Sequence, residues 1–210
     1  MLPDSLGDSA PTCVGVILAA GNSQRMGRDK ARLPWLDGQM LLPWMVRAFQ
    51  ASGWTPIVVL GPHNHGCWAN DLPGARLCLN EQPERGKTTS LALALTAVPA
   101  SARHIMISAV DQPRLPELYA HLRSMAESRS DSVIVPDEKG HRGHPVVLKA
   151  ELKEEFERLD ENSGGLRGIL DRHLASTYRL PCPPEWMAWD CNTPASYVEA
   201  LAWFRAQHTA

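Results

Sequence analysis

The chain has 210 residues, a length that favours one α/β domain and leaves little room for a second. Hydrophobic residues make up 44% of it, charged residues 21%, and the formal net charge is -2, which excludes the basic excess that nucleic-acid binding normally requires. No run approaches the roughly 20 apolar residues of a membrane span, and no secretory signal pattern precedes the first apolar run. We therefore expect a cytoplasmic protein that binds neither nucleic acid nor a membrane.

The five cysteines are scattered, odd in number and without Cys-x-x-Cys spacing. This pattern indicates neither a disulfide framework nor a structural zinc site, so we expect buried free thiols.

Apolar runs alternate with segments of helical periodicity along the chain. A leader at 1–12, expected to be disordered because it has few apolar residues, precedes one domain at 13–210. Strands are predicted at 14–18, 57–60, 76–79, 104–108 and 132–135, and helices at 41–51, 89–97 and 115–127. This alternation predicts a single-domain, Rossmann-like three-layer αβα sandwich with a mostly parallel sheet, whose ligands bind beyond the carboxyl ends of the strands.

The segment after the first strand combines small residues with fixed positive charge. Residues 14–30 read VGVILAAGNSQRMGRDK, and the small residues allow backbone amides to approach an anion. Arg25 offers a fork-shaped donor for phosphate oxygens, and Lys30 offers a point charge. We expect the amides of 20–27 to hold nucleotide phosphates. A surface loop with solvated Arg25 and Lys30 is the alternative.

An acidic residue, Asp111, follows the apolar run 105–110. A carboxylate at the end of such a run is costly unless it meets a cation or hydrogen-bond donors. A hard oxygen ligand for Mg²⁺ fits this position, and so does a cap for the next helix; the two roles are compatible.

These motifs resemble the signature of the MobA-like NTP transferases, nucleotidyltransferases typified by the enzymes of molybdenum cofactor biosynthesis. Three later motifs occur in the family's order, namely DQP at 111–113, RGHPV at 142–146 and DCNTP at 190–194. The resemblance covers about the whole chain from residue 13 onward. It implies the nucleotide-diphospho-sugar transferase fold, catalytic roles for Arg25, Lys30 and Asp111, and Mg²⁺ bound to Asp111.

The resemblance also implies a nucleotide site in which the segment 80–91 matches a G-x-S-S-S-L element. A capped helix start is the alternative for that segment. The sequence Ala19-Ala20-Gly21 is similar to the cytidylyltransferase branch and favours CTP, whereas guanylyltransferases usually have Ala-Gly-Gly, which leaves more room beside a purine. The expected nucleotide-binding residues are Leu18, Ala19, Ala20, Gly21, Ser23, Arg25, Lys30, Asn80, Gly86 and Ser90.

A second substrate site is implied by Gly143, His144 and Pro145, which resemble the segment that contacts a pterin phosphate in the cytidylyltransferases. Arg167 is the further expected phosphate contact. A turn-stabilising histidine and a surface helix arginine are the alternatives.

Two departures from the family pattern concern acidic residues. Asn162 and Ser163 stand where the family often has Gly-Asp, and Asn192 stands where many relatives carry a second aspartate. Asp190 is therefore the expected second metal ligand, with a helix-capping role as the alternative.

The activity that the resemblance implies is Mg²⁺-dependent transfer of CMP from CTP to the terminal phosphate of molybdopterin, with release of pyrophosphate. A phosphate monoester is already ionised near neutral pH, so positioning should dominate over proton removal. The product would be destined for a molybdenum hydroxylase. The alternatives are transfer from GTP, another phosphate acceptor, a non-catalytic cofactor-binding chaperone, and an oxidoreductase, the name that some family members carry.

Overall fold

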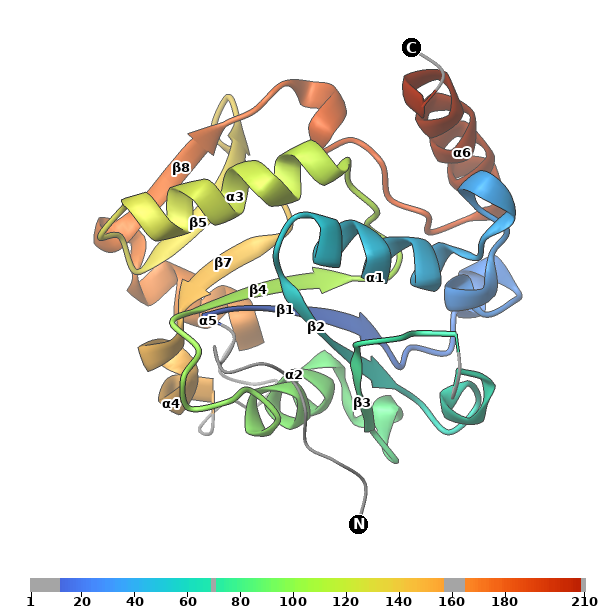
Figure 1. Ribbon diagram of the computed structural model, residues 1–210, viewed down its shortest axis with the longest axis horizontal. Coiled ribbons are helices and arrows are strands. Elements are labelled where there is room, and N and C mark those ends of the chain that lie inside the picture. Colours follow the sequence, from blue (N-terminus) through green and yellow to red (C-terminus); the bar gives the residue numbers. More distant parts are fainter. Residues whose placement is uncertain (1–11, 69–70, 157–164, 209–210) are drawn as a thin grey trace.

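A computed structural model describes residues 12–68, 71–156 and 165–208. One mixed, mostly parallel sheet lies between two layers of helices (Figure 1), which confirms the predicted αβα sandwich. One layer holds α1 (Leu41–Ala51), α3 (Pro116–Ser128) and α6 (Pro194–His208). The other holds α2 (Lys87–Thr96), α4 (Lys153–Phe156) and α5 (Gly165–Arg172). Most of the predicted leader lies outside the described residues.

The sheet of the described residues has eight strands in the order β3-β2-β1-β4-β7-β5-β6, with β8 paired to β5. Parallel pairing joins β1 to β2 and β4, β2 to β3, and β5 to β8, whereas β6 and β7 run antiparallel to their neighbours. The strands are β1 (Cys13–Ala19), β2 (Thr55–Leu60), β3 (Arg76–Leu79), β4 (His104–Ala109), β5 (Val133–Glu138), β6 (His141–Arg142), β7 (Val146–Lys149) and β8 (Thr177–Pro181).

The strand order reverses direction at β1. The chain passes from β1 to β2 and β3 on one side, and β4 then pairs with the opposite edge of β1. The register aligns Leu18 with Ala109, so both strands end at the same height. Ligands of open α/β sheets bind at such a reversal point. The loop after β1 and the segment after β4 therefore share one crevice.

Alternating side chains of β1 divide the core between the two helix layers. Ile17 and Ala19 pack with α1, α3 and α6, whereas Val14 and Val16 pack with α2 and α5. On the first face, the ring of Phe204 in α6 lies 5.2 Å from that of Trp35 and 5.5 Å from that of Trp44 in α1, measured between centroids. This aromatic packing holds α6, and with it the preceding segment 190–193, against the domain.

Three further observations bear on the initial expectations. All five cysteines are free; Cys13, Cys182 and Cys191 are buried, Cys78 is partly buried and Cys67 is exposed. Within the described residues, no helix combines the length and the apolar character that crossing a membrane demands. The helix α2 begins two residues earlier than predicted, at Lys87.

Gly15 is required by close packing in the middle of β1. A Cβ added there would meet the ring of Phe49, with Cε2 at 2.7 Å, and would lie 3.2 Å from Cβ of Trp54. Because both neighbours are buried, we expect Gly15→Ala to lower the free energy of unfolding by about 1–3 kcal/mol, measured by urea denaturation. Gly66→Ala is the control, since the described residues place no heavy atom within 4 Å of a Cβ there. Equal stability of the two variants would contradict this account.

Candidate active site

The loop after β1 is shaped by hydrogen bonds of Ser23. Ser23 has φ 51, and Gly27 after the short helix Gln24–Met26 has φ 72, so the chain turns sharply on both sides of Arg25. The Ser23 hydroxyl donates to the carbonyl of Gly21 at 3.4 Å and accepts from the N–H of Lys30 at 3.2 Å. Met26 is buried beneath the loop. The backbone of the loop is thus held before any ligand arrives.

A buried asparagine that the sequence analysis did not single out also supports this loop. The amide nitrogen of Asn64 donates to the carbonyl of Ala19 at 3.0 Å and to Oδ2 of Asp29 at 3.2 Å. The Asp29 side chain in turn accepts from the N–H of Ala31 and thereby caps the short helix Lys30–Arg32. Asn64 therefore connects the end of β1 to the residue that precedes Lys30.

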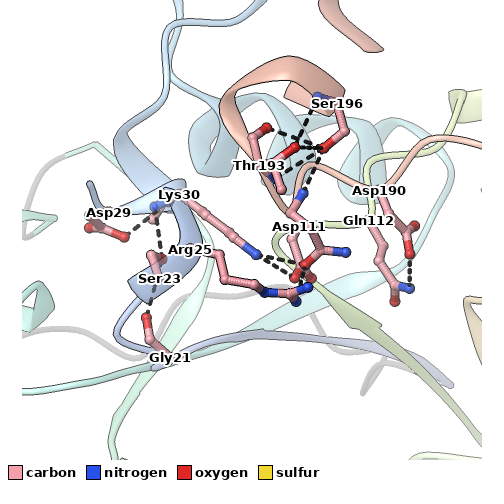
Figure 2. A network of polar contacts seen from close by, with 12 residues as sticks. Gly21, Ser23, Arg25, Asp29, Lys30, Asp111, Gln112, Asp190, Thr193 and Ser196 are labelled. Carbon is pink, nitrogen blue, oxygen red and sulfur yellow. Dashed lines mark hydrogen bonds and ion pairs between the residues drawn. The ribbon is translucent and has the colours of Figure 1, made fainter. Parts of the chain in front are cut away.

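Two cations converge on the end of β4 (Figure 2). Nζ of Lys30 lies 2.8 Å from Oδ2 of Asp111 and 3.0 Å from Oδ1 of Asn192, and Nη2 of Arg25 lies 3.1 Å from the same Asn192 oxygen. The side chains of Lys30 and Asp111 are only 10% and 19% exposed. Residues that are up to 167 positions apart in the sequence therefore form one polar network.

A cavity of about 610 Å³ opens beside this network. Its walls come from the end of β1 and its loop, the start of α2, the end of β4 and the segment before α6. The predicted residues that line it are Leu18, Ala20, Gly21, Ser23, Arg25, Lys30, Gly86, Ser90 and Asp111.

Two predicted nucleotide-binding residues support the wall of this cavity without lining it. The carbonyl of Ala19 accepts the hydrogen bond from Asn64. The buried amide of Asn80 donates to Oγ1 of Thr89 at 3.0 Å and to Oγ of Ser90 at 2.8 Å. Thr89 also donates to the carbonyl of Gly86, so the alternative of a hydroxyl-capped helix start describes part of what this segment does.

A second cavity, of about 460 Å³, adjoins the first. Three of the residues expected at the second substrate, Gly143, His144 and Arg167, line it together with an apolar wall that includes Leu91 and Val146. Pro145 is not part of its lining. Burial, reinforced by the nearby guanidinium of Arg114, lowers the pKa of His144, so its imidazole is neutral at neutral pH. A neutral imidazole still offers one N–H donor.

Arg114, which follows the DQP motif, joins three loops and was not predicted as a site residue. Its side chain is 2% exposed. It donates to the carbonyl of His144 at 3.2 Å, to that of Pro113 at 2.9 Å and to that of Trp189, and its Nη2 lies 3.0 Å from Oδ1 of Asp190. Arg114 thus ties the loop between β6 and β7 to the segment before α6.

The carboxylates of Asp111 and Asp190 lie on different hollows. Asp190 lines a hollow of about 340 Å³ with Arg114 and His144, and its second oxygen accepts from Nε2 of Gln112 at 3.2 Å. Figure 2 shows Asp190 turned toward Gln112 and away from the Lys30 network. Across the described ranges, no three His, Cys, Asp or Glu side chains gather in a way that could hold a metal ion.

The structure describes one of the three altered family positions. Asn192 lies inside the cation network, whereas Asn162 and Ser163 lie outside the described residues. Arg167 is 84% exposed and is 3.8 Å from Asp171 on the same helix.

The chain matches one family model and is similar to several named proteins over most of its length. A family model described as the MobA-like NTP transferase domain matches residues 15–177. The probable molybdenum cofactor guanylyltransferase of Mycobacterium avium (strain 104) is 31% identical over 197 residues, covering 91% of this chain and 96% of that protein. The molybdenum cofactor cytidylyltransferase of Escherichia coli (strain K12) is 31% identical over 196 residues with the same coverage. Nicotine blue oxidoreductase of Paenarthrobacter nicotinovorans is 29% identical, covering 90% and 96%.

Solved structures share the fold. Rv0371c from Mycobacterium tuberculosis H37Rv superposes with a TM-score of 0.74 at 26% identity, covering 92% of this chain and 99% of that one. A structure of Rv0371c in complex with manganese has a TM-score of 0.70 at 24% identity, covering 91% and 98%.

Replacing Arg114 tests whether it holds the three loops together. Arg114→Met removes the donor to Asp190 and to the buried carbonyls, and we expect it to lower the free energy of unfolding by about 2–3 kcal/mol in chemical denaturation. The expected loss of stability is moderate because the side chain of Asp190 is 39% exposed, so water replaces part of the lost interaction. Arg123→Met, which breaks an exposed ion pair with Glu127, should change stability by less than about 0.5 kcal/mol. A similar small change in both variants would refute the role of Arg114.

Proposed function

Because the chain belongs to the family of MobA-like NTP transferase domains and is a nucleotidyltransferase of molybdenum cofactor biosynthesis, we propose that it transfers CMP from CTP to the terminal phosphate of molybdopterin. Pyrophosphate is released, Mg²⁺ is required, and the dinucleotide cofactor is passed to a molybdenum hydroxylase.

The observation that carries this proposal is the convergence of Arg25, Lys30 and Asp111 on a cavity that adjoins a second one. Transfer of a nucleotidyl group requires a triphosphate in one space and an acceptor phosphate in the next, so that the acceptor oxygen meets the α-phosphorus. The first cavity has the cations for a triphosphate. The second has an apolar wall for a ring system, with the neutral imidazole of His144 as a hydrogen-bond donor.

The chain's own residues account for binding and orientation of the triphosphate. Backbone amides of the loop around Gly21 and Ser23 would hold the β- and γ-phosphates, and Arg25 would grip phosphate oxygens with two parallel donors. Lys30 would place its ammonium at the α-phosphate, where the cation is held close by Asp111 and Asn192. Because these groups are already fixed, little reorganisation accompanies charge development.

A divalent cation fits the donors on the cavity wall. Mg²⁺ in nucleotide sites is usually held by one or two protein oxygens together with substrate phosphates. Asp111 would supply the carboxylate, and the manganese complex of Rv0371c shows a divalent cation with a protein of the same fold. When bound, Mg²⁺ would offset negative charge on the phosphates. Asp190 stays a predicted ligand, although its oxygens here accept from Arg114 and Gln112.

The preference for CTP rests on Ala20. Its side chain is buried in the core cluster of the α2 layer and borders the nucleotide cavity. A methyl group at this position occupies space that glycine would leave open, and a purine needs more space than a pyrimidine. The relatives include both guanylyl- and cytidylyltransferases, so we propose CTP on the basis of Ala20 and not on the names of the relatives.

Measurement of pyrophosphate release tests the reaction. With Mg²⁺ and molybdopterin, we expect CTP to exceed GTP in kcat/KM by about tenfold or more. Arg25→Ala should reduce turnover by about 10²-fold because a phosphate donor is lost, and Asp111→Ala should abolish it. Cofactor delivery by Asp111→Ala at the wild-type level would instead favour the non-catalytic chaperone. No release from the wild-type protein with either nucleotide would refute the proposal.

Replacing Ala20 tests the base preference separately. Ala20→Gly should lower the KM for GTP and narrow the ratio of kcat/KM between CTP and GTP by about tenfold, because one methyl group in a pocket discriminates by this order. Gly21→Ala is the matched control for small changes of the loop, since the described residues leave space for a Cβ there. It should weaken both nucleotides without changing their ratio. An unchanged ratio in Ala20→Gly would remove the argument for CTP.

A further inference from the structure

The two cavities share a short stretch of wall at the ends of β1 and β4. Leu18, Lys87 and Ala109 line both of them, and Lys87 is the charged member of this shared set. The first cavity holds the predicted triphosphate site, and the second holds the predicted acceptor residues Gly143 and His144. Lys87 therefore stands where the two substrates would meet.

The backbone places Lys87 at this boundary. It is the first residue of α2, and the preceding Gly86 has φ 108, a conformation that L side chains rarely adopt. The chain turns at Gly86 from the short helix Pro83–Arg85 directly into α2. This turn brings Lys87, at the N-terminus of α2, to the wall of both cavities. The helix lies on the opposite face of the sheet from α1 and α3 (Figure 1).

The ammonium of Lys87 is exposed and available. Over residues 12–68, 71–156 and 165–208, no carboxylate forms an ion pair with it, whereas Lys30 is paired with Asp111 and Arg142 with Asp171. Besides burial and Arg114, the positive charge of Lys87 also lowers the pKa of His144, which lines the second cavity. A lysine that no described carboxylate neutralises, placed where the two cavities meet, can bind phosphate oxygens without first giving up one of the ion pairs that the described residues form.

Nucleotidyl transfer creates a need for such a cation at the junction. An oxygen of the acceptor phosphate attacks the α-phosphorus, a new P–O bond forms, and the bond from the α-phosphorus to the bridging oxygen breaks. The electron pair leaves with pyrophosphate, and no proton has to move. Two anions must therefore approach each other, and a positive charge between them lowers the barrier most when it contacts both.

We propose that Lys87 is a second catalytic lysine, which binds the attacking phosphate of the acceptor and the α-phosphoryl oxygens during transfer. This assignment rests on the proposed function. It gives Lys87 a different task from Lys30, which belongs to the triphosphate side alone.

The test compares Lys87→Ala and Lys87→Arg with Arg85→Ala. Arg85 is exposed, lies two residues away and lines neither cavity, so its removal controls for loss of one positive charge in the same loop. Turnover is measured as pyrophosphate release with CTP, Mg²⁺ and molybdopterin, and the Kd of CTP is measured separately by calorimetry. Circular dichroism checks that each variant is folded.

We expect Lys87→Ala to lower kcat by about 10²-fold and to raise the KM of molybdopterin, while the Kd of CTP changes less than about twofold. Lys87→Arg should recover part of kcat because the charge is kept, and Arg85→Ala should behave as wild type. Unchanged turnover in Lys87→Ala would overturn the assignment, and so would a loss of CTP binding as large as the loss of kcat/KM. Failure of the proposed function gives a different result, because the wild-type protein itself would then release no pyrophosphate. That result would also overturn the role of Lys87.

Discussion

The parallel pairing of β1 with β4 is the constraint on which the site depends. The strand order reverses at β1, and ligands of open α/β sheets bind at such a point, beyond the ends of the two neighbouring strands. The register that aligns Leu18 with Ala109 puts the loop at Gly21 beside Asp111, although the two segments are 90 residues apart. Packing of Ile17 on one face and Val16 on the other fixes this register, since a slip by one residue would exchange the faces.

The cations at this crevice are held by partners that a substrate can replace. Lys30 contacts Asp111 and Asn192, and Arg25 contacts only the amide oxygen of Asn192 among the residues described. A buried ammonium without a partner would be costly, so the free protein needs acceptors for these donors. A triphosphate offers more negative charge than one carboxylate and one amide. The same side chains can therefore be satisfied in the free protein and remain available for the nucleotide.

The local sequence pattern was sufficient to predict elements with strong hydrophobic periodicity. It was not sufficient to predict residues whose roles depend on tertiary contacts. The strands β1 to β5 could be predicted because each forms an apolar run. That Arg25, Lys30 and Asp111 line one cavity could be expected because the loop after β1 and Asp111 both follow predicted strands. The antiparallel strands β6 and β7 are short and separated by only three residues, so they carry no period of their own. Arg114 and Lys87 had no signal, since the role of each depends on loops from distant parts of the chain.

Asn192, at a position where the family resemblance leads us to expect an aspartate, contributes a neutral oxygen to the cation network. Its single amide oxygen accepts from both Lys30 and Arg25, and its backbone N–H is held by the hydroxyl of Ser196 at the start of α6. Hydrogen bonds from a cation to a neutral oxygen are weaker than those to a carboxylate. An aspartate here would place a second negative charge beside Asp111 and hold both cations more tightly. The neutral amide keeps the cations in position while leaving their charge to be matched by the nucleotide, which makes the departure from the family pattern compatible with catalysis.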